Sequence, residues 1–332
     1  MLEFSIVIPT YNRKLLIGEL VERLLDLDYD KGAYEVIIID DASTDGTTEM
    51  MKRYEGTPNF RYEKLAGNSG QSLARNVGIK LARGSVVAFT DSDCLPPRDW
   101  LTRLGDLFKK FGGAVGVGGV VAPRVSDSII TRFLLKKVEI SYESFPEPYV
   151  VDERRTVAPV TNNVAYLREA LIEMKGFCEY MRAGEDPDLN RRLMEQGYTI
   201  VMDTSLAMTH NEPDTLKEFW RRRANRGSGV FPTLLRKGLS KKYLVRKTAL
   251  ESIKLAMYFV PVFWPLLGLY LIWLASAQRA YFAIAASFRE TLTVFGLVVL
   301  DDLAFSAGFF TGVREYLKTR RSPRGDHSTV LT

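Results

Sequence analysis

The stretch GSVVAFTDSDCLPP, residues Gly84–Pro97, decides the fold. Its apolar run Val86–Phe89 predicts a short strand buried on both faces, because an uninterrupted run of β-branched and aromatic residues is typical of a parallel sheet. The run ends at the acidic segment Asp91–Asp93, and the two prolines that follow prevent further regular pairing. The chain therefore carries two carboxylates, two residues apart, at the tip of a buried strand.

Two other stretches are also short apolar runs that predict buried strands. FSIVIPT (Phe4–Thr10) and YEVIIID (Tyr34–Asp40) are predicted strands, and segments with apolar residues at helical spacing separate the three strands. Strand–helix–strand order predicts an α/β fold in which a mostly parallel central sheet is flanked by helices. Ligands of such sheets bind beyond the carboxyl ends of the strands, so the residues that follow these ends should converge.

Composition excludes several classes of protein. Of 332 residues, 46% are hydrophobic, which supports a sizeable core and excludes wholesale disorder. The net charge of +5 is mild and does not by itself indicate a nucleic-acid partner. The only cysteines, Cys94 and Cys178, are far apart, so the sequence shows no disulfide framework or zinc spacing.

The character of the chain changes after about residue 250. Leu255–Ala277 contains no charged residue and is long enough to cross a hydrocarbon core of roughly 30 Å. A second apolar region, Ala280–Val313, is interrupted by charges that include Asp301 and Asp302. Basic residues flank the whole segment on both sides, which favours a membrane hairpin with both ends in the cytoplasm. We therefore predict a catalytic domain at 1–235, a basic juxtamembrane linker at 236–254, hydrophobic membrane-associated helices at 255–317 and a basic tail at 318–332.

Three residues are candidate ligands of a divalent cation. Asp91 and Asp93 offer the hard oxygen atoms that Mg²⁺ and Mn²⁺ prefer, and His210, at the end of another predicted strand, can add an imidazole nitrogen. Each has a simpler reading, since turns select aspartate for backbone hydrogen bonding and histidine is common at surfaces.

Five motifs together point to one family. SIVIPTYNR, VIIIDDASTDGT, NSGQSLARNVGIKLARG, FTDSDC and GEDPDLNRRLMEQGY occur in the order and spacing of the family two glycosyltransferases, over roughly residues 3–230. The resemblance implies the GT-A fold and a nucleotide-sugar donor. It implies that Tyr11 and Asp41 hold the base, that Arg75 assists, that Asp91 lies near the ribose, and that Asp93 binds the Mn²⁺ or Mg²⁺ ion that bridges the diphosphate. Pro9, Asn12 and Arg13, within the first motif, are expected at the same nucleotide-sugar site.

The last motif contains the expected general base. Glu185 and Asp186 lie where a loop meets a helix, with Pro187 suited to the first turn, and the pair could simply complement the helix dipole. The resemblance implies instead that Asp186 is the catalytic base and that Glu185 is its neighbour or substitute. Arg192 matches the arginine of this motif and is expected to position the acidic pair or to contact phosphate.

A basic segment follows the predicted catalytic core. FWRRRANRGSG (Phe219–Gly229) contains Arg223 among several arginines, which suit phosphate geometry, and a Gly-Ser-Gly that could let the segment close over the donor. A solvated or lipid-facing basic helix is the competing interpretation.

The leading functional hypothesis is a metal-dependent, inverting glycosyltransferase at the cell membrane, with its catalytic domain in the cytoplasm. It would transfer sugar from a UDP- or GDP-linked donor to a lipid-linked (polyprenyl) or glycan acceptor in polysaccharide or glycan assembly, with no nucleic-acid partner. One alternative is a polyprenyl-phosphate glycosyltransferase that makes a lipid-activated sugar. The other is a catalytically silent nucleotide-binding module of a membrane complex.

Overall fold

The computed structural model describes residues 3–145, 148–152, 157–179, 181, 183–211, 215–236, 241–260 and 263–319. These residues form two compact units. Among the described residues, the first comprises those up to 124 and 141–211 and contains the β-sheet, whereas the second comprises 125–140 and those from 215 to 319 and is mainly helical. A division at 235 into a catalytic and a membrane domain stays a prediction.

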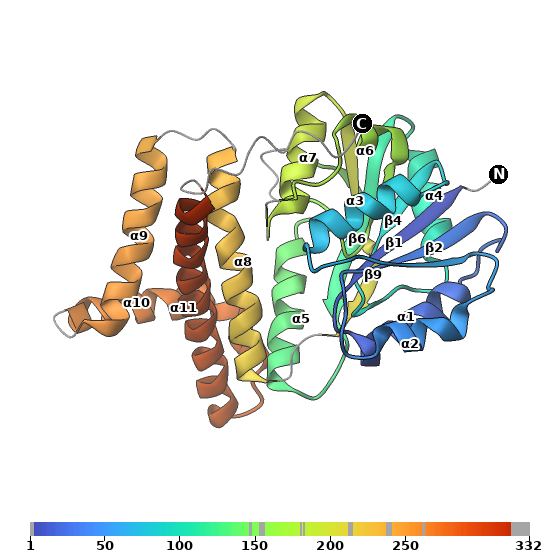
Figure 1. Ribbon diagram of the computed structural model, residues 1–332. Helices are drawn as coiled ribbons and strands as arrows, with labels where there is room; N and C mark the ends of the chain where they lie inside the picture. The colour runs from blue at the N-terminus through green and yellow to red at the C-terminus, as the bar shows by residue number, and fades with distance from the viewer. Residues whose placement is uncertain are drawn as a thin grey trace. The chain divides into compact units, whose positions relative to one another are not determined.

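One mixed sheet forms the centre of the first unit (Figure 1). Its strands lie in the order β3-β2-β1-β4-β8-β6-β9-β5, with β7 paired to β9. Pairing is parallel from β3 to β4 and antiparallel where β8 lies between β4 and β6. The parallel half and its helices confirm the α/β fold that the three apolar runs predict. The strands, in chain order, are β1 (Phe4–Thr10), β2 (Tyr34–Asp40), β3 (Phe60–Lys64), β4 (Val86–Phe89), β5 (Cys94–Leu95), β6 (Ala114–Pro123), β7 (Tyr149–Val150), β8 (Val164–Leu167) and β9 (Thr199–His210).

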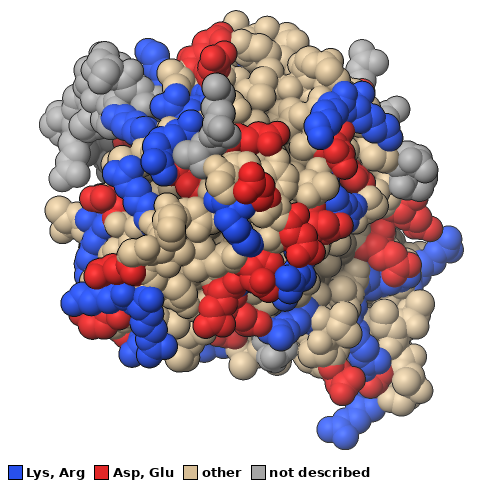
Figure 2. All heavy atoms as spheres, turned by 90° about the vertical axis from the view of Figure 1, so that its right-hand side faces the viewer, with Lys and Arg blue, Asp and Glu red and all other residues tan. Residues whose placement is uncertain are grey.

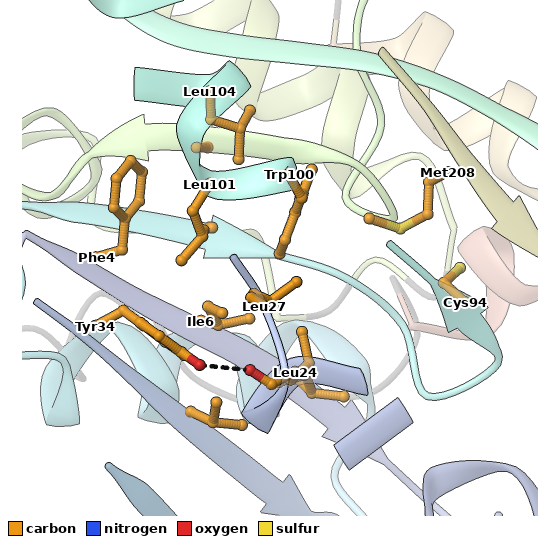
Figure 3. Packing of buried hydrophobic residues seen from close by; sticks show 14 of the residues in the cluster. Phe4, Ile6, Leu24, Leu27, Tyr34, Cys94, Trp100, Leu101, Leu104 and Met208 are labelled. Carbon is orange, nitrogen blue, oxygen red and sulfur yellow. Dashed lines mark hydrogen bonds between the residues drawn. The ribbon is translucent and has the colours of Figure 1, made fainter. Parts of the chain in front are cut away.

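Hydrophobic residues are buried on both faces of this sheet. Every residue of β1 and β2 is buried, as continuous apolar strands of a covered parallel sheet require. Leu24, Trp100 and Leu101, from the covering helices, pack against Phe4 and its neighbours on the sheet (Figure 3). The helices, in chain order, are α1 (Lys14–Leu25), α2 (Thr47–Met51), η1 (Lys52–Tyr54), α3 (Gln71–Leu81), α4 (Trp100–Lys110), α5 (Ile129–Tyr142), α6 (Arg168–Glu173), α7 (Glu185–Glu195), α8 (Leu216–Arg236), α9 (Lys241–Phe259), α10 (Trp264–Ala277), η3 (Arg279–Ile284) and α11 (Phe288–Thr319).

The backbone of the glycine-rich strand β6 packs very closely against the backbones of the neighbouring strand β9 and of the residues before β8. A Cβ atom built on Gly119 would lie 1.9 Å from the carbonyl oxygen of Leu206, and one on Gly118 would lie 2.5 Å from that of Asn163. Real side chains cannot approach so closely, so these positions need glycine to let β6 pair with β8 and β9. This explains the glycine cluster without a dinucleotide-binding loop.

The surface of the chain carries charges of both signs. On the face shown in Figure 2, lysine and arginine side chains are interspersed with aspartate and glutamate. This mixture agrees with the mild net charge of the sequence.

The helical unit shows two features that the sequence-based expectation did not include. Leu255–Ala277 is not one continuous helix, because α9 and α10 lie at 111° to each other. Helix α9 begins at Lys241, so most of the expected linker at 236–254 is helical. Among the described residues, α11 is the helix long and apolar enough by itself to cross a membrane, and α9 with α10 would count as a second span only as a bent pair.

Helix α8 also differs from expectation. It runs without a break through Gly227–Gly229, so the Gly-Ser-Gly segment is a helical turn and not a flexible loop. Gly227 lies where α8 approaches α11 closely, because a Cβ on Gly227 would lie 2.2 Å from the carbonyl oxygen of Phe305 in α11. From residue 320 onward, the expected basic tail lies outside the described residues.

Candidate functional site

A pocket of about 240 Å³ opens at the carboxyl ends of β1, β2 and β4. The strand ends supply most of its wall, which is the convergence that the parallel order predicts. Its polar lining combines an aromatic ring, a guanidinium group and three carboxylates. The lining residues are Pro9, Thr10, Tyr11, Arg13, Asp41, Gln71, Asp91, Ser92 and Asp93.

Tyr11 and Asp41 occupy one part of this lining. The ring of Tyr11 is 46% exposed, which leaves a face available for stacking. Asp41 is buried, and its two carboxylate oxygens accept hydrogen bonds from the backbone amides of Ser69 (2.7 Å) and Gly70 (2.8 Å). These bonds fix the loop before α3, and each oxygen keeps a second lone pair for a ligand donor.

Arg75 links the pocket to the start of α7. Its guanidinium lies 2.8 Å from Asp91 Oδ1 and 2.8 Å from Glu185 Oε1, and its side chain is 1% exposed. Gln71, one turn earlier on α3, donates a hydrogen bond of 2.7 Å to the same Glu185 oxygen. A buried arginine held on two sides by carboxylates is rigid, so it fixes the relative positions of Asp91 and Glu185.

Asp93 and His210 come together as the sequence predicts for cation ligands. His210 Nε2 lies 3.2 Å from Asp93 Oδ1, and both residues are buried. Cys94 lies directly across the β5–β9 pairing from His210, so the ligand atoms of Asp93, Cys94 and His210 all lie within 4.8 Å of one another. The carboxylate oxygen and the imidazole nitrogen of this set suit a divalent cation such as Mn²⁺, whereas the sulfur of Cys94 favours a softer ion. Burial, reinforced by Asp91 and Asp93, raises the pKa of the Cys94 thiol well above its usual value, so this cysteine is no activated nucleophile.

Glu185 and Asp186 have different environments. Glu185 is 3% exposed and is occupied by Arg75 and Gln71. Burial, together with the neighbouring Asp186, raises the pKa of Glu185, and the Arg75 ion pair opposes this shift. Asp186 is partly exposed and accepts a hydrogen bond of 3.3 Å from the backbone amide of Thr161. Of the two, only Asp186 has a carboxylate that a substrate can reach.

Seven of the predicted site residues lie outside this lining: Asn12, Arg75, Glu185, Asp186, Arg192, His210 and Arg223. Asn12 shapes the loop after β1: its φ is 52°, and its side-chain oxygen accepts a hydrogen bond from the amide of Thr44. Arg192 donates to Asp188 and to the carbonyl oxygens of Met174 and Gly176, so its guanidinium secures a turn beside α7.

Arg223 belongs to the helical unit, where it pairs with Asp301. Its expected contact with a donor therefore stays a prediction that no contact in the structure supports.

Sequence reasoning missed Gln71, which lines the pocket, and Cys94, a candidate metal ligand. Gln71 stands four residues before Arg75 in the third motif, so the helical spacing was the available signal that both side chains lie on one face of α3. Cys94 is buried, and only its cross-strand register with His210 reveals it as the third candidate ligand.

Comparisons with known proteins agree with this architecture. Poly(ribitol-phosphate) beta-N-acetylglucosaminyltransferase TarS of Staphylococcus aureus is 40% identical over 94 residues, which are 28% of this chain and 16% of TarS. The dolichyl N-acetyl-alpha-D-glucosaminyl phosphate 3-beta-D-2,3-diacetamido-2,3-dideoxy-beta-D-glucuronosyltransferase of Methanococcus voltae is 24% identical over 243 residues, 70% of this chain and 74% of that enzyme. The chain thus spans less than a fifth of the length of TarS.

Solved structures share the fold. Mannosyltransferase PcManGT from Pyrobaculum calidifontis, in complex with GDP-Man and Mn²⁺, superposes with a TM-score of 0.60 at 20% identity, over 90% of this chain and 85% of that one. TarS 1-349 in complex with UDP gives a TM-score of 0.52 at 19% identity, over 99% and 95% of the two chains. These likenesses confirm the GT-A fold. The model of Glycosyl transferase family 2 matches residues 5–174, more than half of the chain. The protein therefore belongs to glycosyl transferase family 2.

Proposed function

We propose that the protein is an inverting, metal-dependent glycosyltransferase that uses a nucleotide-diphosphate sugar. The observation that carries the proposal is the convergence of Tyr11, Asp41, Asp91 and Asp93 in one pocket. GDP-Man and UDP in the PcManGT and TarS structures support a donor of this class. Tyr11 would stack on the base, Asp41 would accept a hydrogen bond from it, and Asp91 would lie near the ribose.

The proposed reaction is a single displacement. Asp186 takes the proton of the acceptor hydroxyl as its oxygen forms a bond to the anomeric carbon, and the bond from that carbon to the diphosphate breaks with inversion. A divalent cation held by Asp93 and His210 would supply Lewis-acid stabilisation of the departing diphosphate. Arg75, through Asp91 and Glu185, holds the donor side and the base helix in register.

We further propose that the acceptor is lipid-linked and that residues beyond about 255 associate with the cytoplasmic face of the cell membrane. The name of the M. voltae relative, which contains a dolichyl phosphate sugar, supports the acceptor class. The apolar helix α11 supports membrane association.

The test is nucleoside diphosphate release from UDP- and GDP-sugars by the purified chain, with Mn²⁺ or Mg²⁺ and lipid-linked acceptors. Asp186→Asn should lower turnover by about two to four orders of magnitude, the usual contribution of a general base. Asp93→Ala should abolish the dependence on the cation. The matched control is Asp106→Asn, since Asp106 is exposed on α4 and forms an ion pair with Lys109. Full turnover by Asp186→Asn would refute the assignment of the base.

A further inference from the structure

Gln71 lies between the pocket at the strand ends (the donor pocket) and the acidic pair of α7. Its side chain is exposed in the lining of the pocket, and its Nε2 donates a hydrogen bond of 2.7 Å to Glu185 Oε1. Glu185 is 3% exposed, so this one contact connects an open pocket with a buried carboxylate. The proposed reaction assigns no task to Gln71.

Two backbone contacts tie Gln71 to Asp41, the proposed hydrogen-bond acceptor for the nucleotide base. The carboxylate of Asp41 accepts hydrogen bonds from the amides of Ser69 and Gly70, the two residues that precede Gln71. Gly70 has a φ of 93°, which glycine adopts without strain, and α3 begins directly after it at Gln71. The position of Gln71 therefore depends on that of Asp41 through only two residues.

Glu185 in turn begins the helix that carries the proposed general base. It is the first residue of α7, and Asp186 follows it. Its Oε1 atom accepts hydrogen bonds from both Gln71 and Arg75 NH1, the latter at 2.8 Å. Arg75 is buried whereas Gln71 is exposed in the pocket, so of these two hydrogen-bond donors only Gln71 can respond to an occupant of the pocket.

The strength of the hydrogen bond between Gln71 and Glu185 depends on the water around Gln71. Water competes with a hydrogen bond at an exposed side chain, and the net strength of that bond increases when a neighbouring group excludes the water. A nucleotide in the donor pocket would exclude water from Gln71 and so stabilise the first turn of α7. Because such coupling is reciprocal, an ordered first turn would favour nucleotide binding by the same factor.

We propose that Gln71 is a positioning residue that couples occupancy of the donor pocket to the orientation of Asp186. Gln71 acts through Glu185, and Asp186 remains the group that contacts the acceptor. The inference rests on the proposed function for the identity of the occupant, a nucleoside diphosphate with a divalent cation. The coupling itself concerns binding and does not require transfer of a sugar.

The first experiment measures hydrogen exchange in the full chain by mass spectrometry, with and without UDP or GDP and Mn²⁺, and without any sugar. In the unmodified chain, nucleotide should slow exchange in the peptide that covers α7 about two- to tenfold, the effect expected when one hydrogen bond is strengthened. Gln71→Met keeps the length of the side chain but removes its hydrogen-bond donor, so it should abolish this protection. Calorimetry on the same samples should show a fall in nucleotide affinity of no more than about the same factor.

The second experiment measures steady-state release of nucleoside diphosphate. Gln71→Met should lower kcat about ten- to a hundredfold, because a small misplacement of a catalytic group costs up to about this much. The KM for the sugar donor should rise less than kcat falls, since the groups that hold the nucleotide are unchanged. A role in stability alone would not separate the two constants in this way.

Two further variants make the comparison sharper. Gln71→Asn keeps an amide in the pocket wall but is one methylene shorter, so it should lose the contact with Glu185 and behave as Gln71→Met does. The matched control is Gln196→Met, because Gln196 is exposed at the other end of α7 and lies outside the lining of the donor pocket. It should retain both the nucleotide-dependent protection and the turnover of the unmodified chain.

Protection of α7 that persists in Gln71→Met and Gln71→Asn would overturn the proposal, and so would a KM that rises more than kcat falls. Absence of nucleotide-dependent protection in the unmodified chain would overturn it even where sugar is transferred. The glycosyltransferase proposal fails separately, when no sugar donor turns over. Protection of α7 that depends on Gln71 would then show the coupling in a chain that binds nucleotide without transferring sugar.

Discussion

At the scale of single residues, Arg75 is the side chain that joins the donor pocket to the acidic pair on α7. It is fully buried between Asp91 and Glu185, and removing one member of a buried ion network leaves charges without compensation. Arg75→Met should therefore lower the free energy of unfolding by about 3–5 kcal/mol. Arg75→Lys keeps the charge but cannot reach both carboxylates with paired donors, so it should recover only part of this loss. Denaturant unfolding of the three proteins measures both effects; a neutral Arg75→Met would show that the network is not coupled to folding.

The second prediction at this scale concerns the contribution of Cys94 to metal binding. Its sulfur shares a cluster with Asp93 and His210, and thiolate ligands favour soft cations over hard ones. Cys94→Ser should weaken Cd²⁺ binding far more than Mn²⁺ binding in calorimetric titrations. Cys178→Ser is the control, since Cys178 is also buried but lies outside this cluster. An equal loss for both metals would show that the sulfur is a neighbour of the site and not a ligand.

The positions of some site residues could be predicted from the sequence, whereas the contacts of others could not, and the difference has a physical reason. Parallel strands bring their carboxyl ends to one edge, so Tyr11, Asp41 and Asp91 could be expected together from strand order alone. Arg192 is different, because an arginine in a motif binds whichever acceptor is near. Its acceptors, two carbonyl oxygens and Asp188, lie on a turn whose path the sequence does not reveal.

At the scale of elements, the contact between α8 and α11 depends on small residues. A Cβ on Gly308 would lie 1.9 Å from the carbonyl oxygen of Ala224, and one on Gly312 would lie 2.1 Å from that of Ser228. Gly308→Ala should therefore force the helices apart and destabilise the protein by about 1–3 kcal/mol, the usual cost of overpacking. Thermal or denaturant unfolding measures this cost.

The same helix supplies the control for that substitution. A Cβ on Gly296 of α11 meets nothing within 4 Å. Gly296→Ala should raise stability by up to about 1 kcal/mol, because alanine has the higher helix propensity. If both substitutions destabilise equally, the loss comes from the backbone of α11 and not from its approach to α8.

A buried carboxylate joins three elements in the first unit. Glu35 in β2 accepts hydrogen bonds from Ser5 Oγ in β1 (2.7 Å) and from the Arg83 amide before β4 (2.8 Å). Burial raises the pKa of Glu35, but the hydrogen bonds from Arg83 and Ser5 outweigh it and lower this pKa below its usual value. The ionised form therefore stabilises the fold at neutral pH, and this contribution is lost as the pH falls through the depressed pKa.

Glu35→Gln should accordingly be less stable than the unmodified chain at pH 7, by about 1.5–3 kcal/mol for hydrogen bonds to a charged group. The difference should shrink in acid, as the unmodified protein loses the same contribution. Denaturant unfolding at a series of pH values measures it, with Glu63→Gln on the exposed part of β3 as the control. A gap that stays constant down to the acid limit would contradict the assignment.

At the scale of the whole molecule, the sequence predicts an α/β part and an apolar helical part, but it does not predict where one ends and the other begins. Alternating strands and helices end near residue 211, and the elements described after it, from α8 onward, are helices. Residues 125–140 join the helical unit although they lie inside the stretch that resembles the family, because α5 buries Phe133 and Leu134 among residues of that unit. Such long-range packing leaves no local signal, whereas Pro265, in the first turn of α10, is a local signal for the break between α9 and α10.

The exposed apolar face of α10 gives the last prediction. Leu269, Ile272 and Trp273 are 67%, 70% and 61% exposed, and apolar side chains so exposed on one helix favour burial in a lipid interface. Ile272→Glu combined with Trp273→Glu should reduce flotation of the chain with phosphatidylcholine liposomes, because each change places a charge in the apolar boundary. Leu15→Glu is the matched control: Leu15 is 91% exposed on α1, in the unit that contains the sheet. If the double variant floats as well as the control, α10 does not contact the bilayer, and membrane association must then depend on α11.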